Sequence, residues 1–276
     1  MINVAALQMI STDSVSENLE SAAKLITEAV SKQAKLVTLP ENFPLMPKEK
    51  SERLAIQEAF AAGPIQSFLS EQAKQHQVYL LGGTIPLQTD NPDKVFPASL
   101  LFDPQGKCIA HYDKMHLFDV LVDESNDESY CESDSFEPGN EIVVAPTEIG
   151  NIGLSVCYDL RFPEMYRKMH EHDVQIITAP SAFTATTGEA HWEYLLRARA
   201  VENLCYVIAS NQGGMHVNER ETWGHSMIVD PWGSILASVD KGVGIAVAAI
   251  DLEKQAALRN TFPCLSHRKF NNEFSK

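Results

Sequence analysis

Three residues in separate segments have the side chains needed for acyl transfer through a cysteine: Cys157, Lys114 and Glu41. A cysteine that works without a histidine needs a lowered pKa and a base nearby, and a lysine with a carboxylate can supply both. The set therefore predicts attack of a thiolate on a carbonyl carbon. Lysine would serve as the cation and glutamate as the general acid or base.

Cys157 comes at the end of an apolar stretch, residues 152–157, that predicts a strand, and Pro163 can open a helix shortly after it. A thiol at such a turn can be accessible while neighbouring backbone N–H groups, such as that of Tyr158, face an oxyanion. The alternative from position alone is a small buried apolar side chain, which is how most free cysteines behave.

Lys114 and Glu41 each follow a predicted strand. Glu41 comes directly after residues 36–39 and Pro40, and open α/β sheets bind ligands near the carboxyl ends of their strands. Lys114 comes just after a predicted hairpin strand and has apolar neighbours. Taken alone, Lys114 is equally compatible with a surface lysine and Glu41 with a polar turn residue.

Length and composition predict a single large domain over residues 1–276. With 44% hydrophobic and 21% charged residues, and no apolar run approaching twenty residues, the chain has a globular composition that argues against a membrane role. The first ten residues lack the features of a signal peptide, and five cysteines form no CxxC pair. We therefore expect a cytoplasmic protein with reduced thiols.

Charge and metal-binding patterns exclude other classes of function. A net charge of −15 without a cluster of basic residues argues against nucleic-acid binding. The histidines form no HExxH or similar ligand pair, so we expect no metal. The acidic residues 121–137 lack the spacing of a calcium loop and predict a solvated surface loop.

Strands and helices alternate along most of the chain. The expected strands are 2–8, 36–39, 78–81, 99–102, 108–112, 151–157, 174–179 and 205–210, and the expected helices begin at Val15, with a Ser14 capping box, at Pro64 and at Pro163 and span 189–203. Hairpins are expected at residues 103–106 and 230–233. This order predicts an α/β fold with mixed sheets covered by helices.

Three ordered motifs resemble the signature of the nitrilase superfamily: LPENF at 39–43, YDKMHLFDV at 112–120 and GLSVCYDLRFPE at 153–164. The resemblance extends from the first predicted strand beyond the DPWG turn. It implies a four-layer αββα sandwich, a homodimer, and catalysis by Glu41, Lys114 and Cys157 without a cofactor. It also implies that Glu132, in CESDSFEPG at 131–139, is a second glutamate that orients the lysine and the substrate.

Three segments resemble the branch of deaminated glutathione amidases: residues 131–139, 181–203 and 224–233. That branch implies a small amide that carries carboxylates. Arg161 is the candidate for binding a carboxylate, and a salt bridge to Asp159 or Glu164 is its structural alternative. Phe183 and Thr187 are pocket candidates by resemblance alone.

Two positions depart from the superfamily pattern. Asp113 precedes the lysine where relatives often have a basic residue, and Pro97 with Ala98 occupies a stretch where many have an asparagine. These departures concern contacts with the substrate and leave the catalytic set intact.

The expected reaction is amide hydrolysis through a thioester. Cys157 attacks the amide carbonyl, and Lys114 with the backbone N–H of Tyr158 stabilises the oxyanion. Glu41 protonates departing ammonia and then activates the water that hydrolyses the thioester. The nearest alternative is an ω-amidase acting on 2-oxoglutaramate, and the others are a Cys–His peptidase or acyltransferase and a non-catalytic binding protein of the same fold.

Overall fold

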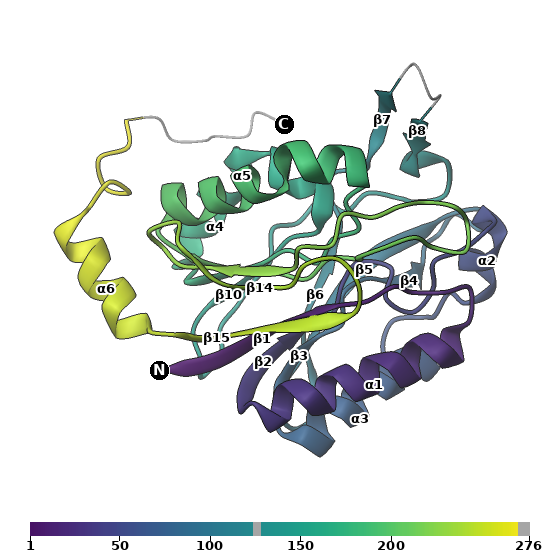
Figure 1. The fold of residues 1–276 in the computed structure, drawn as a ribbon, viewed down its shortest axis with the longest axis horizontal. Helices are drawn as coiled ribbons and strands as arrows, with labels where there is room; N and C mark the ends of the chain where they lie inside the picture. The colour runs from purple at the N-terminus through teal and green to yellow at the C-terminus, as the bar shows by residue number, and fades with distance from the viewer. Residues whose placement is uncertain (124–127, 270–276) are drawn as a thin grey trace.

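Two β-sheets lie face to face between two layers of helices in the computed structural model, which describes residues 1–123 and 128–269 (Figure 1). The first sheet has the order β15-β1-β2-β3-β5-β4, with β6 beside β5. The second has the order β14-β13-β12-β11-β10-β9. The helices α1 and α3 cover the outer face of the first sheet, and α4 and α5 cover that of the second (Figure 1). The predicted four-layer αββα sandwich is confirmed.

The strands of the first sheet are β1 (Ile2–Gln8), β2 (Ala34–Thr38), β3 (Tyr79–Leu81), β4 (Ile85–Gln88), β5 (Val95–Phe102), β6 (Cys108–Asp113) and β15 (Gly244–Ile250). Those of the second are β9 (Val144–Ala145), β10 (Ile152–Leu154), β11 (Ile176–Thr178), β12 (Tyr206–Ala209), β13 (Met227–Val229) and β14 (Ile235–Ser238). Parallel pairing joins β1, β2 and β3, and likewise β10, β11 and β12; the remaining pairs are antiparallel. Both sheets are therefore mixed, as predicted.

The helices are α1 (Val15–Ser31), α2 (Lys50–Ala55), α3 (Pro64–His76), α4 (Pro163–Met169), α5 (Ala185–Asn203) and α6 (Leu252–Thr261), with short 3₁₀ helices η1 (Glu132–Asp134), η2 (Cys157–Arg161) and η3 (His170–His172). The side chain of Ser14 caps α1 by accepting from the backbone N–H of Glu17. Pro163 begins α4 and Pro64 begins α3, where proline fits the first helical turn. These helix starts agree with the sequence-based prediction.

Alternating side chains of β1 contribute to two different cores. Val4 and Ala6 pack between the sheets, whereas Ala5 and Leu7 pack against the layer that contains α1 and α3. A strand buried on both faces reads as a continuous apolar run, because each face of the sheet is covered. The two cores together fix the sheet whose strand ends carry Glu41 and Lys114.

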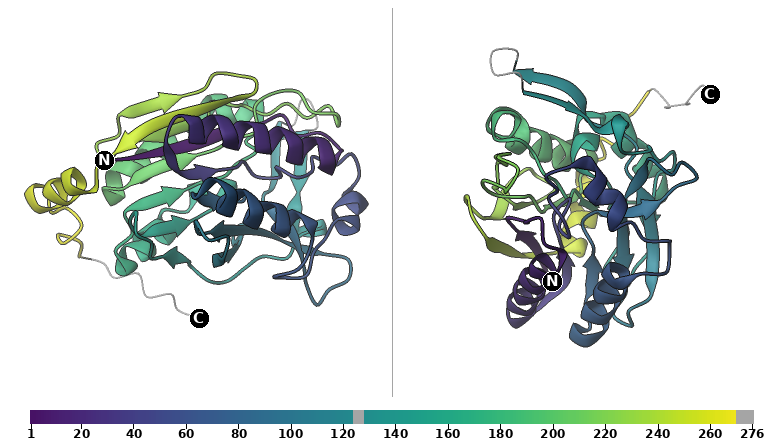
Figure 2. Two further views of the ribbon diagram at one scale, coloured as in Figure 1. Left: turned by 90° about the horizontal axis from the view of Figure 1, so that it is seen from below. Right: turned by 90° about the vertical axis from the view of Figure 1, so that its right-hand side faces the viewer.

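Several sequence-based boundaries differ from the structure, and three of the differences concern segments near the predicted site residues. The strand before Cys157 ends at Leu154, and α5 begins at Ala185 because the Thr184 hydroxyl caps it by accepting from the N–H of Thr187. Within the acidic segment, β7 (Asp119–Asp123) and β8 (Glu128–Cys131) form an antiparallel hairpin that projects from the body (Figure 2). The prediction of a loop was wrong there, because cross-strand pairing outweighs the polar composition; residues 124–127 lie outside the described residues.

In the described ranges, no helix combines the length and the apolar character that crossing a bilayer requires.

Candidate active site

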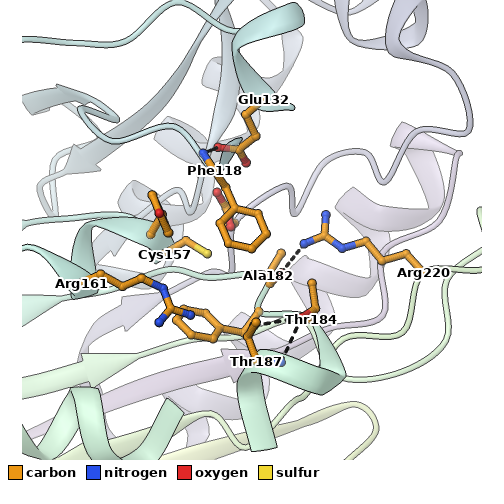
Figure 3. Close-up of a pocket in the computed structure, with 11 residues that line it drawn as sticks. Phe118, Glu132, Cys157, Arg161, Ala182, Thr184, Thr187 and Arg220 are labelled. Carbon is orange, nitrogen blue, oxygen red and sulfur yellow. Dashed lines mark hydrogen bonds between the residues drawn. The ribbon is translucent and has the colours of Figure 1, made fainter. Parts of the chain in front are cut away.

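A pocket opens at the carboxyl ends of strands from both sheets (Figure 3). Its lining residues are Glu41, Phe118, Glu132, Cys157, Tyr158, Arg161, Ala182, Phe183, Thr184, Thr187 and Arg220. Every residue predicted for the site is in this lining except Lys114, which is fully buried and bonded to two of the lining residues. The structure thus brings the whole predicted set together.

Lys114 lies between two carboxylates. Its Nζ donates to Oε1 of Glu41 at 2.9 Å and to Oε2 of Glu132 at 2.7 Å, and the same Glu132 oxygen accepts from the backbone N–H of Phe118 at 2.8 Å. Burial disfavours the charge on Lys114, but Glu132 and Glu41 outweigh it and hold the lysine pKa above its ordinary value. Burial likewise acts to raise the pKa of Glu132, but Lys114 outweighs it and lowers that pKa. Lys114 and Glu132 are therefore charged at neutral pH.

The backbone around Glu41 is fixed from two sides. Gln212 donates its side-chain amide to the carbonyl oxygen of Glu41 at 3.0 Å, and the hydroxyl of Thr84 accepts from the N–H of Asn42 at 2.8 Å. Gly83 has a φ of 54°, and a Cβ there would lie 2.0 Å from the carbonyl oxygen of Pro40. Only glycine allows this approach, which sets where the chain turns after β2.

Cys157 begins η2 in a left-handed backbone conformation, with a φ of 49°. This conformation is uncommon outside glycine and is held here by the surroundings. The N–H of Cys157 donates to the carbonyl oxygen of Pro180 at 3.0 Å. The following N–H, that of Tyr158, has no acceptor among the described residues and is available to a ligand. The arrangement is a strand-to-helix nucleophile elbow.

Asp159 anchors this elbow from beneath. Its buried carboxylate accepts from the hydroxyl of Tyr112 at 2.6 Å and from the N–H of Val156 at 2.7 Å. Its other oxygen contacts Nδ1 of His116 at 2.7 Å. The Arg199 guanidinium donates twice to the carbonyl oxygen of Leu160, at 2.7 and 3.0 Å. The side chains that hold the elbow therefore come from β6, the segment after it, and α5.

The pKa of the Cys157 thiol differs from the expectation drawn from the sequence. Burial and the Glu41 carboxylate raise this pKa well above its ordinary value, and Lys114 offsets them only in part. The predicted lowering of the thiol pKa was therefore wrong. The thiol rests in its protonated form, so attack by this sulfur would need a base to take its proton.

Arg161 points into the pocket, and no carboxylate in the described ranges forms an ion pair with it. One guanidinium nitrogen contacts Nδ1 of His191 at 3.2 Å, and the group lies 5.7 Å from the ring centre of Tyr158 and 5.6 Å from that of Phe183. The salt bridge to Asp159 or Glu164, considered as an alternative, is not formed by these described residues. The guanidinium is free to bind an anion.

Four pocket residues were not predicted from the sequence: Phe118, Ala182, Thr184 and Arg220. Phe118 belongs to the motif that contains Lys114, so its position near the lysine was a usable signal. Thr184 precedes α5 and both caps the helix and reaches the pocket. Arg220 lies in an irregular segment between β12 and β13, and no spacing in the sequence marks it.

The two departures from the family pattern do not line the pocket. Asp113 pairs with His111 at 2.8 Å, and the carbonyl oxygen of Pro97 accepts from the N–H of Lys114 at 3.2 Å. Pro97 therefore holds the backbone of the lysine. Of the described residues, no group of three histidine, cysteine or acidic side chains is arranged to hold a metal ion.

Comparison with known proteins shows the family to which this chain belongs. The sequence profile of the carbon-nitrogen hydrolases matches residues 3–260. The chain belongs to the carbon-nitrogen hydrolase family. It is thus a hydrolase that acts on non-peptide carbon–nitrogen bonds.

Curated relatives of this carbon-nitrogen hydrolase include two deaminated glutathione amidases. That of Synechocystis sp. is 43% identical over 269 residues, covering 96% of this chain and 97% of the relative. That of Homo sapiens is 38% identical over 270 residues, covering 96% of this chain and 82% of the relative. Both alignments extend over nearly all of this chain, including every residue of the pocket lining.

Solved structures have the same fold. The Caenorhabditis elegans NitFhit protein matches with a TM-score of 0.90 at 35% identity, covering 100% of this chain and 68% of that one. Saccharomyces cerevisiae Nit3, of the nitrilase superfamily, matches with a TM-score of 0.85 at 32% identity, covering 98% and 97%. The predicted resemblance to the nitrilase superfamily is confirmed.

The charge on Glu41 should be detectable through the thiol of Cys157. Because that charge helps to raise the thiol pKa, Glu41→Gln should move the midpoint of the alkylation rate against pH to a lower pH. Iodoacetamide labelling followed by peptide mass spectrometry measures Cys157 alone. Exposed Cys131 in the same digest is the internal control, with one profile in both proteins. An unchanged or higher midpoint for Cys157 would contradict this electrostatic account.

Proposed function

We propose that this carbon-nitrogen hydrolase is an amidase for deaminated glutathione, with Cys157 as nucleophile and Glu41 as acid and base. The observation that carries the proposal is the buried Lys114 bonded to both Glu41 and Glu132 at the floor of a pocket that contains Cys157. The names of the relatives support the choice of substrate.

The first half of the proposed reaction forms the thioester. Glu41 takes the proton of the Cys157 thiol as its sulfur bonds to the amide carbonyl carbon. The N–H of Tyr158 and the ammonium of Lys114 stabilise the oxyanion, and donors of this kind contribute about 2.7–4 kcal/mol each. The carbon–nitrogen bond then breaks as Glu41 passes its proton to the departing nitrogen.

The second half releases the acid. Glu41 takes a proton from a water molecule, whose oxygen attacks the thioester carbonyl. Collapse of this second tetrahedral intermediate breaks the carbon–sulfur bond and returns a proton to the sulfur of Cys157. Glu132 holds Lys114 in place and keeps it charged in both halves. These steps use no cofactor.

The leaving group needs a correction to the expectation of ammonia. Deaminated glutathione is the amide of 2-oxoglutarate with cysteinylglycine, so its hydrolysis at this bond releases the dipeptide amine. Ammonia leaves only from a primary amide such as 2-oxoglutaramate, the substrate of the ω-amidase alternative. The identity of the amine released therefore distinguishes the two activities.

Two other candidates fit the site less well. A Cys–His peptidase or acyltransferase needs a histidine at Cys157, but the described pocket lining contains none. A non-catalytic binding protein would not need a lysine buried between two glutamates, since such a group is costly to bury. We further propose a cytoplasmic location, because all five cysteines are free.

Removing the nucleophile or the base should stop turnover. Cys157→Ala should abolish hydrolysis, and Glu41→Gln should lower kcat about 10²- to 10⁴-fold because general acid–base catalysis is lost. The assay measures 2-oxoglutarate formed from deaminated glutathione and from 2-oxoglutaramate, with circular dichroism to check folding.

Cys108→Ala, at a thiol outside the pocket, is the matched control and should retain wild-type turnover. Full activity in folded Cys157→Ala would overturn the proposed function. Activity on 2-oxoglutaramate with none on deaminated glutathione would favour the ω-amidase.

We also propose that the chain forms a homodimer through an apolar patch beside α5, formed by Tyr194, Val201, Trp232 and Phe262. Tyr194 and Val201 are seven positions apart on α5 and so lie on one face. The rings of Trp232 and Phe262 are 5.8 Å apart, and Gly233, next to Trp232, approaches Val201. Tyr194 is 73% exposed and Trp232 is 64% exposed. Large apolar side chains that gather on an exposed surface are typical of a face that binds a partner.

Light scattering should give a mass about twice 30.6 kDa. Tyr194→Glu with Trp232→Glu should shift the protein to the monomer mass, because charges would be buried at the interface. Phe60→Glu, at an exposed aromatic residue outside the patch, is the control and should leave the mass unchanged. A monomeric wild-type protein would refute the dimer.

A further inference from the structure

Arg220 is a cation of the pocket that the catalytic steps do not use. Its guanidinium donates to the carbonyl oxygen of Ala182 and lies 5.1 Å from the ring centre of Tyr130, while its Nε is buried without a hydrogen-bond partner. Among the described residues, no carboxylate lies within ion-pair distance of it. A charged group held this way keeps donor capacity for a ligand.

Hydrogen bonds fix the backbone of Arg220, as the binding of a ligand by its side chain requires. Its carbonyl oxygen accepts from the N–H of His216 at 3.0 Å, and its N–H donates to the side chain of Asn218 at 3.2 Å. The next residue, Glu221, accepts from the N–H of Ala185 at 3.0 Å, which ties this segment to the start of α5. Hydrogen bonds therefore hold in place the backbone that carries this guanidinium.

Arg161 and Arg220 enter the pocket from opposite sides (Figure 3). Arg161 lies with Tyr158, Phe183 and His191. Arg220 belongs to the segment that begins with Gln212, whose side chain holds the backbone of Glu41. An amide placed on Cys157 between these arginines would have one cation on each side of the bond that breaks.

The position of Glu41 indicates which side receives the leaving group. Gln212, in the segment that carries Arg220, donates its side-chain amide to the carbonyl oxygen of Glu41 at 3.0 Å. Because Glu41 delivers the proton to the departing nitrogen in the proposed reaction, the leaving amine faces this segment and Arg220.

We infer that Arg220 is a specificity residue that binds a carboxylate in the leaving-group half of the substrate, while Arg161 binds the carboxylate of the acyl half. The inference rests on the proposed function. Lys114 is already engaged by Glu41 and Glu132, so the two pocket arginines remain for two substrate carboxylates. The site is thus matched to an N-substituted amide with a carboxylate on each side, rather than to a primary amide.

The test compares three substrates with the same acyl half: deaminated glutathione, its C-terminal glycinamide form and 2-oxoglutaramate. Only the first has a carboxylate in the leaving group. In Arg220→Met, the ratio of kcat/KM for deaminated glutathione to that for 2-oxoglutaramate should fall about 10- to 100-fold, as expected for a lost charge-assisted hydrogen bond. Arg220→Lys should restore part of the ratio, since it keeps the charge but not the fork.

The wild-type enzyme gives a second measurement that needs no variant. It should prefer deaminated glutathione over the glycinamide form by about 10-fold or more, and Arg220→Met should bring that preference close to one. Lys241→Met is the charge-matched control, because Lys241 is an exposed partner of Glu221 outside the pocket lining. Both ratios should stay at the wild-type value in this control.

Two results would overturn the inference: an unchanged substrate ratio in Arg220→Met, or equal use of the free acid and the glycinamide by the wild type. If the variant does not fold, the wild-type comparison alone decides. Failure of the proposed function has a different signature, in which the wild-type enzyme hydrolyses neither deaminated glutathione nor its glycinamide form.

Discussion

The buried ion group of Lys114, Glu41 and Glu132 is the interaction on which the rest of the site depends. An ammonium with no solvent exposure is tolerated only because two carboxylates accept its hydrogen bonds at 2.9 and 2.7 Å. Loss of one partner from such a group typically costs about 3–5 kcal/mol, since an uncompensated charge stays buried. The group therefore forces the ends of β2, β6 and β8 to meet at one place.

Charge placement also sets the protonation of the proposed nucleophile. Burial and the carboxylate of Glu41 raise the pKa of the Cys157 thiol, so its sulfur is a thiol rather than a reactive thiolate. The same carboxylate is the group that can accept the proton when a carbonyl arrives beside Lys114. Asp159 and Arg199 anchor the elbow. They thereby hold the sulfur of Cys157 and the free N–H of Tyr158 in fixed positions relative to each other.

Local sequence patterns predicted the site residues that lie at the ends of strands. They did not predict the features of the site that depend on contacts between segments far apart in the sequence. Strand ends and motifs predicted Glu41, Lys114 and Cys157 because each lies beside a regular element. The positive φ of Cys157 and its raised pKa arise from packing across both sheets, which no local pattern records. Arg220 was missed for the same reason: its position depends on a long-range contact with Ala182.

In the proposed mechanism, every substrate with a given acyl half passes through one thioester on Cys157, and the partitioning of that intermediate tests this most directly. Hydroxylamine added to the wild-type enzyme should compete with water for the thioester and yield a hydroxamate. Deaminated glutathione and 2-oxoglutaramate should then give the same ratio of hydroxamate to 2-oxoglutarate, whatever their rates. Ratios that differ between the two substrates, or hydroxamate formation by Cys157→Ala, would contradict the account.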